Sequence, residues 1–166
     1  MANFDEHIIQ AKNNLRFLEQ VNTEVGGNWD WQVTVCFYSA LHLVNAHVVA
    51  KTGKNYLTHG KVAAIINPYT ELSVAKLNED VYNSYIALSN LSRRSRYLIN
   101  EKAANRDDGD VQVCCITHSK HFKKAIHHLN IIISYLSKEH KTVFGKTSVS
   151  CLDLNGQTFD HFTVQV

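Results

Sequence analysis

Proline is almost absent from this chain, with a single one among 166 residues, and glycine occurs only seven times. So few breakers of regular structure exclude collagen-like and proline-rich disordered classes. A large excess of charge of one sign is also lacking, because the chain has 17 Lys and Arg and 15 Asp and Glu, which gives a net charge of +2. The chain therefore has no overall positive field that would bind nucleic acid indiscriminately, and any such contact has to be local.

Targeting segments and disulfide patterns are missing as well. The N-terminus is acidic and is not followed by an apolar run of signal-peptide length, and no stretch of about 18 uncharged apolar residues follows later. The four cysteines, Cys36, Cys114, Cys115 and Cys151, do not have the spacing of a disulfide framework. We therefore expect a cytoplasmic protein with free thiols and no membrane partner.

Helical periodicity is the dominant pattern of the first 140 residues. Apolar residues recur at intervals of three and four, which predicts helices over residues 4–25, 29–51, 59–66, 73–99 and 117–140. Asn3 with Glu6 resembles a capping box at the first start, and Thr58 can cap the third helix. Residues 29–51 are apolar nearly all round, so this helix is predicted to be the central one. Residues 100–110 have almost no apolar content and are expected to form a loop.

The pattern changes after Lys141. From Val149 to Val164, apolar and polar residues alternate around Asn155-Gly156, a dipeptide that favours the type I′ turn of a β-hairpin. An isolated hairpin is marginal in water, so we expect it to pack on the helices or on a partner chain. The predicted fold is therefore all-α, with a helical bundle over residues 1–140 and a short C-terminal β-hairpin within residues 141–166.

A cluster of arginines stands at the end of the fourth predicted helix. Arg93 and Arg96 are three residues apart, and Arg93 and Tyr97 are four apart, so two guanidinium groups and a phenol share one helix face. Guanidinium groups pair with phosphate oxygens in a bidentate way, so such a face suits a phosphate. Alternatively, these arginines complement the helix C-terminus and pair with carboxylates of a neighbouring helix.

Two of the ten histidines have a suggestive position. His42 lies in the central helix one turn after Tyr38, and His59 opens the third helix. A histidine near arginines could act as general acid or base in cleavage at a ribose 2′-hydroxyl, with arginine stabilising the charge on phosphate. Alternatively, His42 is a core histidine hydrogen-bonded to a helix or side-chain partner, and His59 is a surface residue at a helix start.

A metal site is not expected. Cys114, Cys115, His118 and His121 fall within eight residues, but adjacent cysteines rarely chelate one zinc together and no second ligand pair follows. The sequence also lacks a glycine-rich phosphate loop, a Gly-x-Ser-x-Gly elbow and a His-Glu-x-x-His helix. We therefore expect no metal and no other cofactor.

Three parts of the chain, WQVTVCFYSALHLVNAHV (31–48), His59 and YIALSNLSRRSRY (85–97), together resemble bacterial proteins of the HEPN superfamily. The resemblance covers roughly residues 29–98. It implies an up-and-down bundle of four to five helices that commonly pairs into a homodimer with a cleft between the subunits.

The resemblance implies two kinds of activity. Many HEPN domains are metal-independent ribonucleases of toxin–antitoxin or defence systems and use an Arg-x4–6-His motif, whereas others are binding or dimerisation modules, sometimes beside a nucleotidyltransferase. The histidine that follows Arg93, Arg94 and Arg96 here is His118, too distant for that motif. We therefore expect a nucleotide- or RNA-binding and homodimerisation module, with a nucleotidyltransferase or an antitoxin as the partner protein that the resemblance implies. A metal-independent endoribonuclease and a purely structural interaction domain are the alternatives. The candidate site residues are Tyr38, His42, His59, Arg93, Arg96 and Tyr97.

Overall fold

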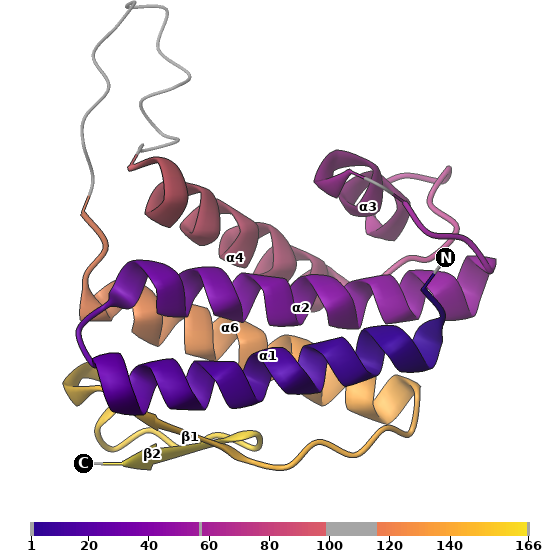
Figure 1. Ribbon diagram of the computed structural model, residues 1–166. Coiled ribbons are helices and arrows are strands. Elements are labelled where there is room, and N and C mark those ends of the chain that lie inside the picture. The colour runs from indigo at the N-terminus through magenta and orange to yellow at the C-terminus, as the bar shows by residue number, and fades with distance from the viewer. Residues whose placement is uncertain (1, 57, 99–115, 166) are drawn as a thin grey trace, which may run out of the picture.

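The computed structural model describes residues 2–56, 58–98 and 116–165, and within them helices form a bundle that is followed by two short strands (Figure 1). The helices are α1 (Phe4–Val25), α2 (Trp29–Thr52), α3 (His59–Ile66), α4 (Glu79–Tyr97) and α6 (Ser119–Glu139). The C-terminal elements are β1 (Thr147–Ser150), the short 3₁₀ helix η1 (Leu152–Leu154) and β2 (Phe162–Gln165). The predicted all-α bundle with a small C-terminal β-structure is confirmed.

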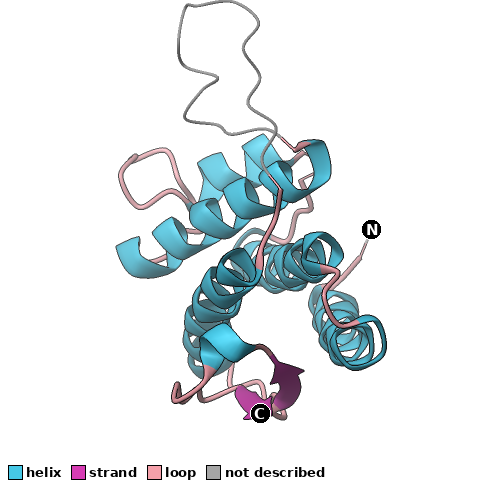
Figure 2. Cartoon of the chain, turned by 90° about the vertical axis from the view of Figure 1, so that its left-hand side faces the viewer, coloured by secondary structure: helices cyan, strands magenta, loops and turns pink. Residues whose placement is uncertain are grey.

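The helix α2 occupies the centre of the bundle, as predicted. It packs against α1, α4 and α6 and, over a shorter length, against α3. In Figure 1, α3 and α4 lie above α2 and α1 lies below it. Figure 2 shows the bundle from its end, with the two strands beneath the helices. Because neighbours cover α2 on several sides, residues as different in position as Val33, Phe37 and Leu43 are all buried.

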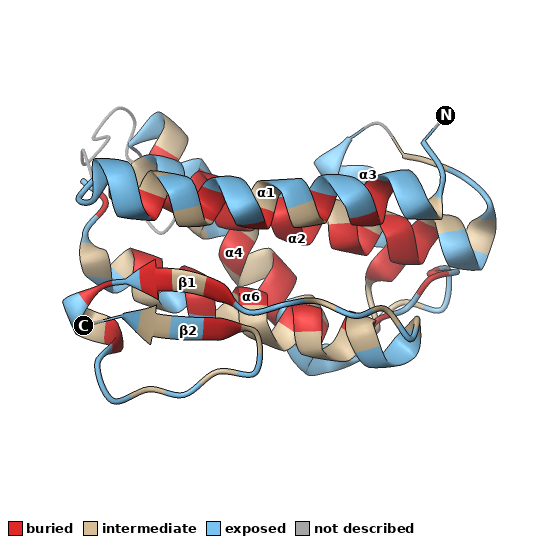
Figure 3. Cartoon of the chain, turned by 60° about the horizontal axis from the view of Figure 1, so that its bottom comes forward, coloured by how far each residue is buried: buried red, intermediate tan, exposed pale blue. Residues whose placement is uncertain are grey.

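The apolar composition of α2 follows from this central position. Among the described helices, α2 has the length and mean hydropathy, 1.5, that crossing a membrane requires. However, 72% of that apolar window is buried inside the bundle, and a core helix passes the same test. Figure 3 shows the same inward burial along α1 and α6.

Local capping residues set the starts of the helices. Asn3 and Glu6 form the predicted capping box, since Glu6 N donates to Asn3 Oδ1 (2.9 Å) and Asn3 N donates to Glu6 Oε2 (2.7 Å). Thr58 caps α3, because its Oγ1 accepts from Lys61 N (3.3 Å). Both starts agree with the sequence patterns.

The predicted start of the fourth helix is wrong. The helix α4 begins at Glu79, where Asn78 Oδ1 accepts from Val81 N (2.9 Å). Residues 73–78 lie beside α3 instead, because Ala75 N and Leu77 N donate to the carbonyls at its C-terminal end, with distances of 3.2 and 3.0 Å. The last carbonyls of a helix lack partners within it, and here residues 73–78 supply those partners instead of forming the first turns of α4. The predicted loop at 100–110 lies outside the described residues.

The predicted hairpin is also wrong, because β1 and β2 pair in parallel, with Thr147 opposite Phe162. Asn155-Gly156 does form a turn, in which Gln157 N donates to Leu154 O (3.0 Å). Asn155 has φ −52° and ψ 135° and Gly156 has φ 75°, which are the angles of a type II turn. This turn ends η1 and does not join the two strands directly. A longer connection follows it, as parallel strands require, before β2 pairs with β1.

The C-terminal extension packs on the bundle, which was one of the two predicted alternatives. The side chain of Asn22 in α1 is bonded to Ser150 of β1 in both directions, since its Oδ1 accepts from Ser150 N (2.6 Å) and its Nδ2 donates to Ser150 O (3.1 Å). Glu19 Oε1 accepts from Ser148 N (3.3 Å). Side chains of α1 therefore satisfy the outer edge of β1.

Candidate functional site

Four of the six predicted site residues line one hollow of about 480 Å³ between α3 and α4. They are His59, Arg93, Arg96 and Tyr97, and we call this space the arginine hollow. The rest of its lining is Gly60, Ala63, Tyr85, Ile86, Ser89 and Asn90. The structure therefore brings His59 beside the arginines, although 33 or more residues separate them in the sequence.

Helix geometry places the arginine cluster. Arg93, Arg96 and Tyr97 lie three and four residues apart in the last turns of α4, so their side chains share a face. Arg94, one residue on, turns elsewhere and its Nη2 donates to Ile116 O (3.5 Å). The helix ends at Leu98, which adopts a left-handed conformation with φ 54°.

Arg96 is held in place by its own helix. Its Nε donates to Ser92 O (3.4 Å), and its guanidinium carbon lies 5.3 Å from the centroid of the Tyr97 ring. This cation–π contact keeps the planar group at the surface of the hollow, where Tyr97 itself is 61% exposed. Such a pair offers both a charge and an aromatic face to a ligand.

His59 rests on the aromatic core. Its ring meets the ring of Phe37 edge to face, with centroids 5.4 Å apart, and Phe37 in turn contacts Tyr85 at 6.0 Å. Burial, and then the positive charge of Arg96, lower the pKa of His59 below its usual value. His59 is therefore neutral at pH 7, the form that can accept a proton.

Sequence reasoning missed Tyr85, which lines the same hollow. Its residue is 1% exposed, and its hydroxyl is buried without a hydrogen-bond partner among the described residues. Burial raises the pKa of this phenol, so the hydroxyl keeps its proton and remains a donor. The periodicity assigned Tyr85 to the buried stripe, where a tyrosine hydroxyl normally finds a partner.

His42 and Tyr38 do not belong to the hollow. His42 Nδ1 lies 3.1 Å from Nδ1 of His7 in α1, and His7 Nε2 lies 2.8 Å from Asn55 Oδ1. His42 is therefore hydrogen-bonded to a neighbouring helix, and burial followed by the charge of His7 lowers its pKa. Tyr38 is 36% exposed and contacts Phe37 at 5.7 Å, but it does not line the hollow.

A second hollow, of about 310 Å³, adjoins the first through Arg96, which lines both. It lies between the start of α2 and the end of α4, and we call it the aspartate hollow. It is lined by Asp30, Trp31, Thr34, Ser95, Arg96 and Leu98. Asp30 Oδ1 is buried without a hydrogen-bond partner among the described residues, and Trp31 is 61% exposed. In the sequence these residues were only the start of an apolar helix.

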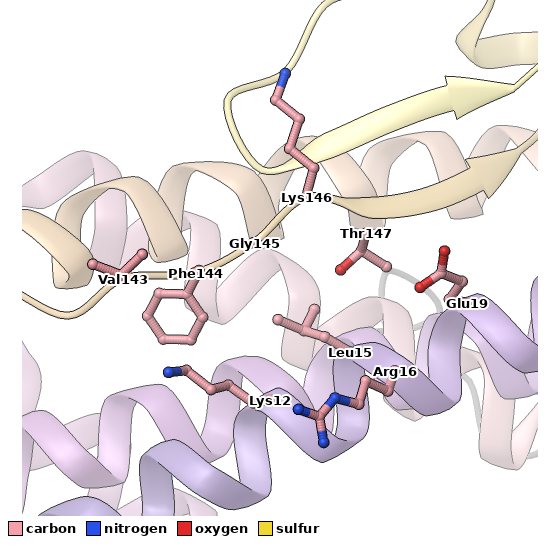
Figure 4. Close-up of a pocket in the computed structure, with 9 residues that line it drawn as sticks. All are labelled: Lys12, Leu15, Arg16, Glu19, Val143, Phe144, Gly145, Lys146 and Thr147. Carbon is pink, nitrogen blue, oxygen red and sulfur yellow. The ribbon is translucent and has the colours of Figure 1, made fainter.

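A third hollow, of about 400 Å³, lies between α1 and the chain before β1 (Figure 4). We call it the extension hollow; Lys12, Arg16, Lys146 and Glu19 are its charged residues. Lys12 Nζ lies 5.3 Å from the Phe144 ring centroid, and Lys146 Nζ donates to a main-chain carbonyl (3.1 Å). Figure 4 shows the Lys146 amine pointing away from α1. Lys12 and Lys146 thus have partners within the chain, and Arg16 Nη1 donates to Asn13 Oδ1 on its own helix (3.4 Å).

No metal-ligand cluster of three or more His, Cys, Asp or Glu side chains occurs within residues 2–56, 58–98 and 116–165. Cys114 and Cys115 lie outside those ranges. Cys36 and Cys151 are free and buried, as expected, and burial raises the pKa of each thiol. Neither thiol therefore has the lowered pKa of a reactive cysteine.

Comparisons with protein-family models, with curated proteins and with solved structures found no match to this chain. The HEPN resemblance therefore stays a prediction, and the geometry of the hollows has to carry the functional argument.

Proposed function

We propose that this chain is a nucleotide- or RNA-binding module whose arginine hollow holds a phosphate group. The observation that supports the proposal is that a single hollow is lined by two arginines, by His59 and by Tyr85, whose buried hydroxyl has no partner among the described residues. Each of these groups can donate to or stabilise phosphate oxygens. A volume of about 480 Å³ falls within the range of small-molecule sites.

The described contacts of Arg96 favour this ligand over the alternative in which that arginine serves only to pair with a carboxylate, because its guanidinium group contacts the Ser92 carbonyl and the Tyr97 ring. Among the residues described as lining the hollow, none is acidic. The permanent positive charge of Arg96 in a partly enclosed space attracts an anion, and Tyr97 adds an exposed aromatic face beside it. An isolated phosphate, a nucleotide and a single-stranded RNA share this recognition chemistry.

The salt dependence of RNA binding tests the proposal. We expect the wild-type chain to bind a labelled single-stranded RNA with an affinity that falls steeply with salt, and Arg96→Ala to reduce the log–log slope by about 1. Arg16→Ala in the extension hollow is the matched control, because it removes the same charge from a different hollow and should leave the slope unchanged. Equal slopes for the wild type and Arg96→Ala would contradict the proposal.

A ribonuclease is the second candidate function, because His59 is neutral at pH 7 and lies beside Arg96. A neutral imidazole can take the proton of a ribose 2′-hydroxyl while the guanidinium stabilises the phosphate charge. Incubation with a mixed RNA pool in EDTA tests this, with Arg96→Ala and His59→Ala as controls against contaminating nuclease. Cleavage that is lost in either variant supports catalysis, whereas no cleavage by any form leaves a binding module.

The homodimer that the HEPN resemblance implies is part of the proposal. Tyr38 is 36% exposed on α2 and lines neither the arginine hollow nor the aspartate hollow, so it supplies aromatic surface for such a contact. Light scattering of the purified chain measures its mass directly. A monomer at micromolar concentration would count against the HEPN analogy in each of its forms.

A further inference from the structure

We propose that the aspartate hollow takes a guanine base, and that this base belongs to the nucleotide whose phosphate lies in the arginine hollow. The inference rests on the proposed function, since it names which nucleotide the chain selects. Arg96 connects the two hollows because it lines both. A nucleotide could therefore place its phosphate on one side of Arg96 and its base on the other.

The carboxylate of Asp30 is the polar group of this hollow that lacks a hydrogen-bond partner within the described part of the chain. Its Oδ1 is buried and has no hydrogen-bond partner among the described residues. The other polar side chains there are engaged, since Thr34 Oγ1 donates to Asp30 O (2.8 Å), and Ser95 Oγ donates to Leu91 O (3.0 Å) and lies 3.1 Å from Thr117 Oγ1. A buried acceptor without a donor is rare in folded proteins, and here a ligand is well placed to supply the donor.

A carboxylate selects one base because it can only accept hydrogen bonds. Guanine presents two neighbouring N–H donors, N1–H and the 2-amino group, on its Watson–Crick edge. Adenine and cytosine place a ring acceptor beside their amino group, and uracil places its single N–H between two carbonyls. Guanine is therefore the base whose edge offers neighbouring donors to the Asp30 carboxylate, of which Oδ1 lacks a partner among the described residues.

Trp31 completes the arrangement. Its side chain lines the hollow and is 61% exposed, so a flat ring can stack on it. Stacking holds any base, whereas the carboxylate distinguishes among bases. The positive charge of Arg96 disfavours a cationic occupant that the Asp30 carboxylate alone would attract.

The test is titration calorimetry of the full chain with guanosine, inosine and adenosine 5′-monophosphates and with guanosine itself. We expect guanosine monophosphate to bind about tenfold or more tightly than adenosine monophosphate, with inosine monophosphate, which lacks the 2-amino group, between them. Asp30→Asn should bring guanosine monophosphate to the level of adenosine monophosphate. The matched control is Asp80→Asn, because Asp80 is the second residue of α4 as Asp30 is of α2, and it lines neither hollow.

The outcomes separate this inference from the proposed function. Equal affinities for the guanine and adenine nucleotides, both weakened by Arg96→Ala, overturn the base proposal and leave the phosphate site standing. Guanosine that binds as tightly as its monophosphate, with Arg96→Ala without effect, overturns the phosphate site and leaves the guanine site standing. No binding of any of these compounds overturns both.

Discussion

The arginine hollow and the extension hollow have similar volumes, about 480 and 400 Å³, and each brings several cations together. Their polar groups nevertheless have different partners. In the extension hollow, Lys12 lies over an aromatic ring, Lys146 donates to a carbonyl, and Glu19 accepts from the main chain of β1. In the arginine hollow, the buried hydroxyl of Tyr85 has no partner among the described residues.

The comparison shows that a hollow's charge is a poor guide to its role. Polar groups that already have partners within the chain hold elements together, as those of the extension hollow hold the C-terminal extension on α1. A buried polar group without a partner costs stability, so its presence needs an explanation, and a ligand is one. Substitutions should therefore lower stability at the first region and alter binding at the second.

The largest effect is expected for Asn22→Ala, at the contact between α1 and β1. Asn22 is 5% exposed and bonds both Ser150 and Gln32, the latter through Nδ2 to Oε1 (2.8 Å). Removing it leaves buried partners unsatisfied, so the free energy of unfolding in urea should fall by about 3 kcal/mol. Nucleotide affinity should stay the same below the new transition. Asn13→Ala on the exposed side of α1 is the control, with an expected change below about 0.5 kcal/mol.

The next effect concerns His47, a buried histidine whose Nδ1 has a hydrogen-bond partner and whose Nε2 has none among the described residues. His47 Nδ1 lies 3.0 Å from Nε2 of His140, and burial, followed by the charge of His140, lowers the pKa of His47 to about 4. The unfolded chain, with a histidine pKa of about 6.5, binds this proton more readily, so the unfolding free energy falls as the pH drops from 6.5 toward 4. Between pH 7 and pH 5 the loss due to His47 is about 2 kcal/mol.

His47→Gln should remove that part of the pH dependence. The unfolding free energies of the wild type and the variant, measured in urea at pH 7 and pH 5, give the difference directly. His127, which is exposed on α6, provides the control, because His127→Gln should retain the slope of the wild type. Parallel pH profiles for the wild type and His47→Gln would show that folding does not lower the pKa of His47.

A smaller effect, with opposite signs for stability and binding, is expected for Tyr85→Phe. The substitution removes a buried hydroxyl that has no partner among the described residues, so the unfolding free energy should rise by about 1 kcal/mol. Nucleotide affinity should fall a few-fold, because the proposed phosphate would be the acceptor that this hydroxyl lacks among the described residues. Tyr69→Phe is the control, since the Tyr69 hydroxyl is exposed and accepts from Asn83 Nδ2 (3.3 Å). A variant that is less stable than the wild type would sink this interpretation.

Much of the bundle could be predicted from the sequence because its determinants are local. The apolar stripe, the Asn3 cap and the Thr58 cap each act within one or two helical turns. The parallel pairing of β1 and β2 could not be predicted from Asn155-Gly156, because a glycine with positive φ suits a type II turn as well as a type I′ turn. The turn follows η1, which packs on α6, and this contact between segments distant in the sequence is not encoded in the dipeptide.

The candidate site could also be predicted only where its determinants are local. Spacing along one helix placed Arg93, Arg96 and Tyr97 on a common face, and the structure adds His59 from another helix. Asp30 and Tyr85 were missed because a lone acid in a first turn and a tyrosine in an apolar stripe have ordinary structural roles. Their unmet hydrogen bonds become visible only when all packed neighbours are known.

The smallest effect distinguishes His59 from the histidines that have partners within the core. A bound phosphodiester, whose charge does not change between pH 7 and pH 5, would raise the lowered pKa of His59 by its negative charge. The complex then takes up a proton that the free chain does not, so RNA affinity should rise as the pH falls, by about threefold over this range. His59→Gln should abolish that rise, while His127→Gln should keep it. If His59→Gln binds RNA with the pH dependence of the wild type, the phosphate does not lie beside His59, and the arginine hollow has to be reconsidered as its site.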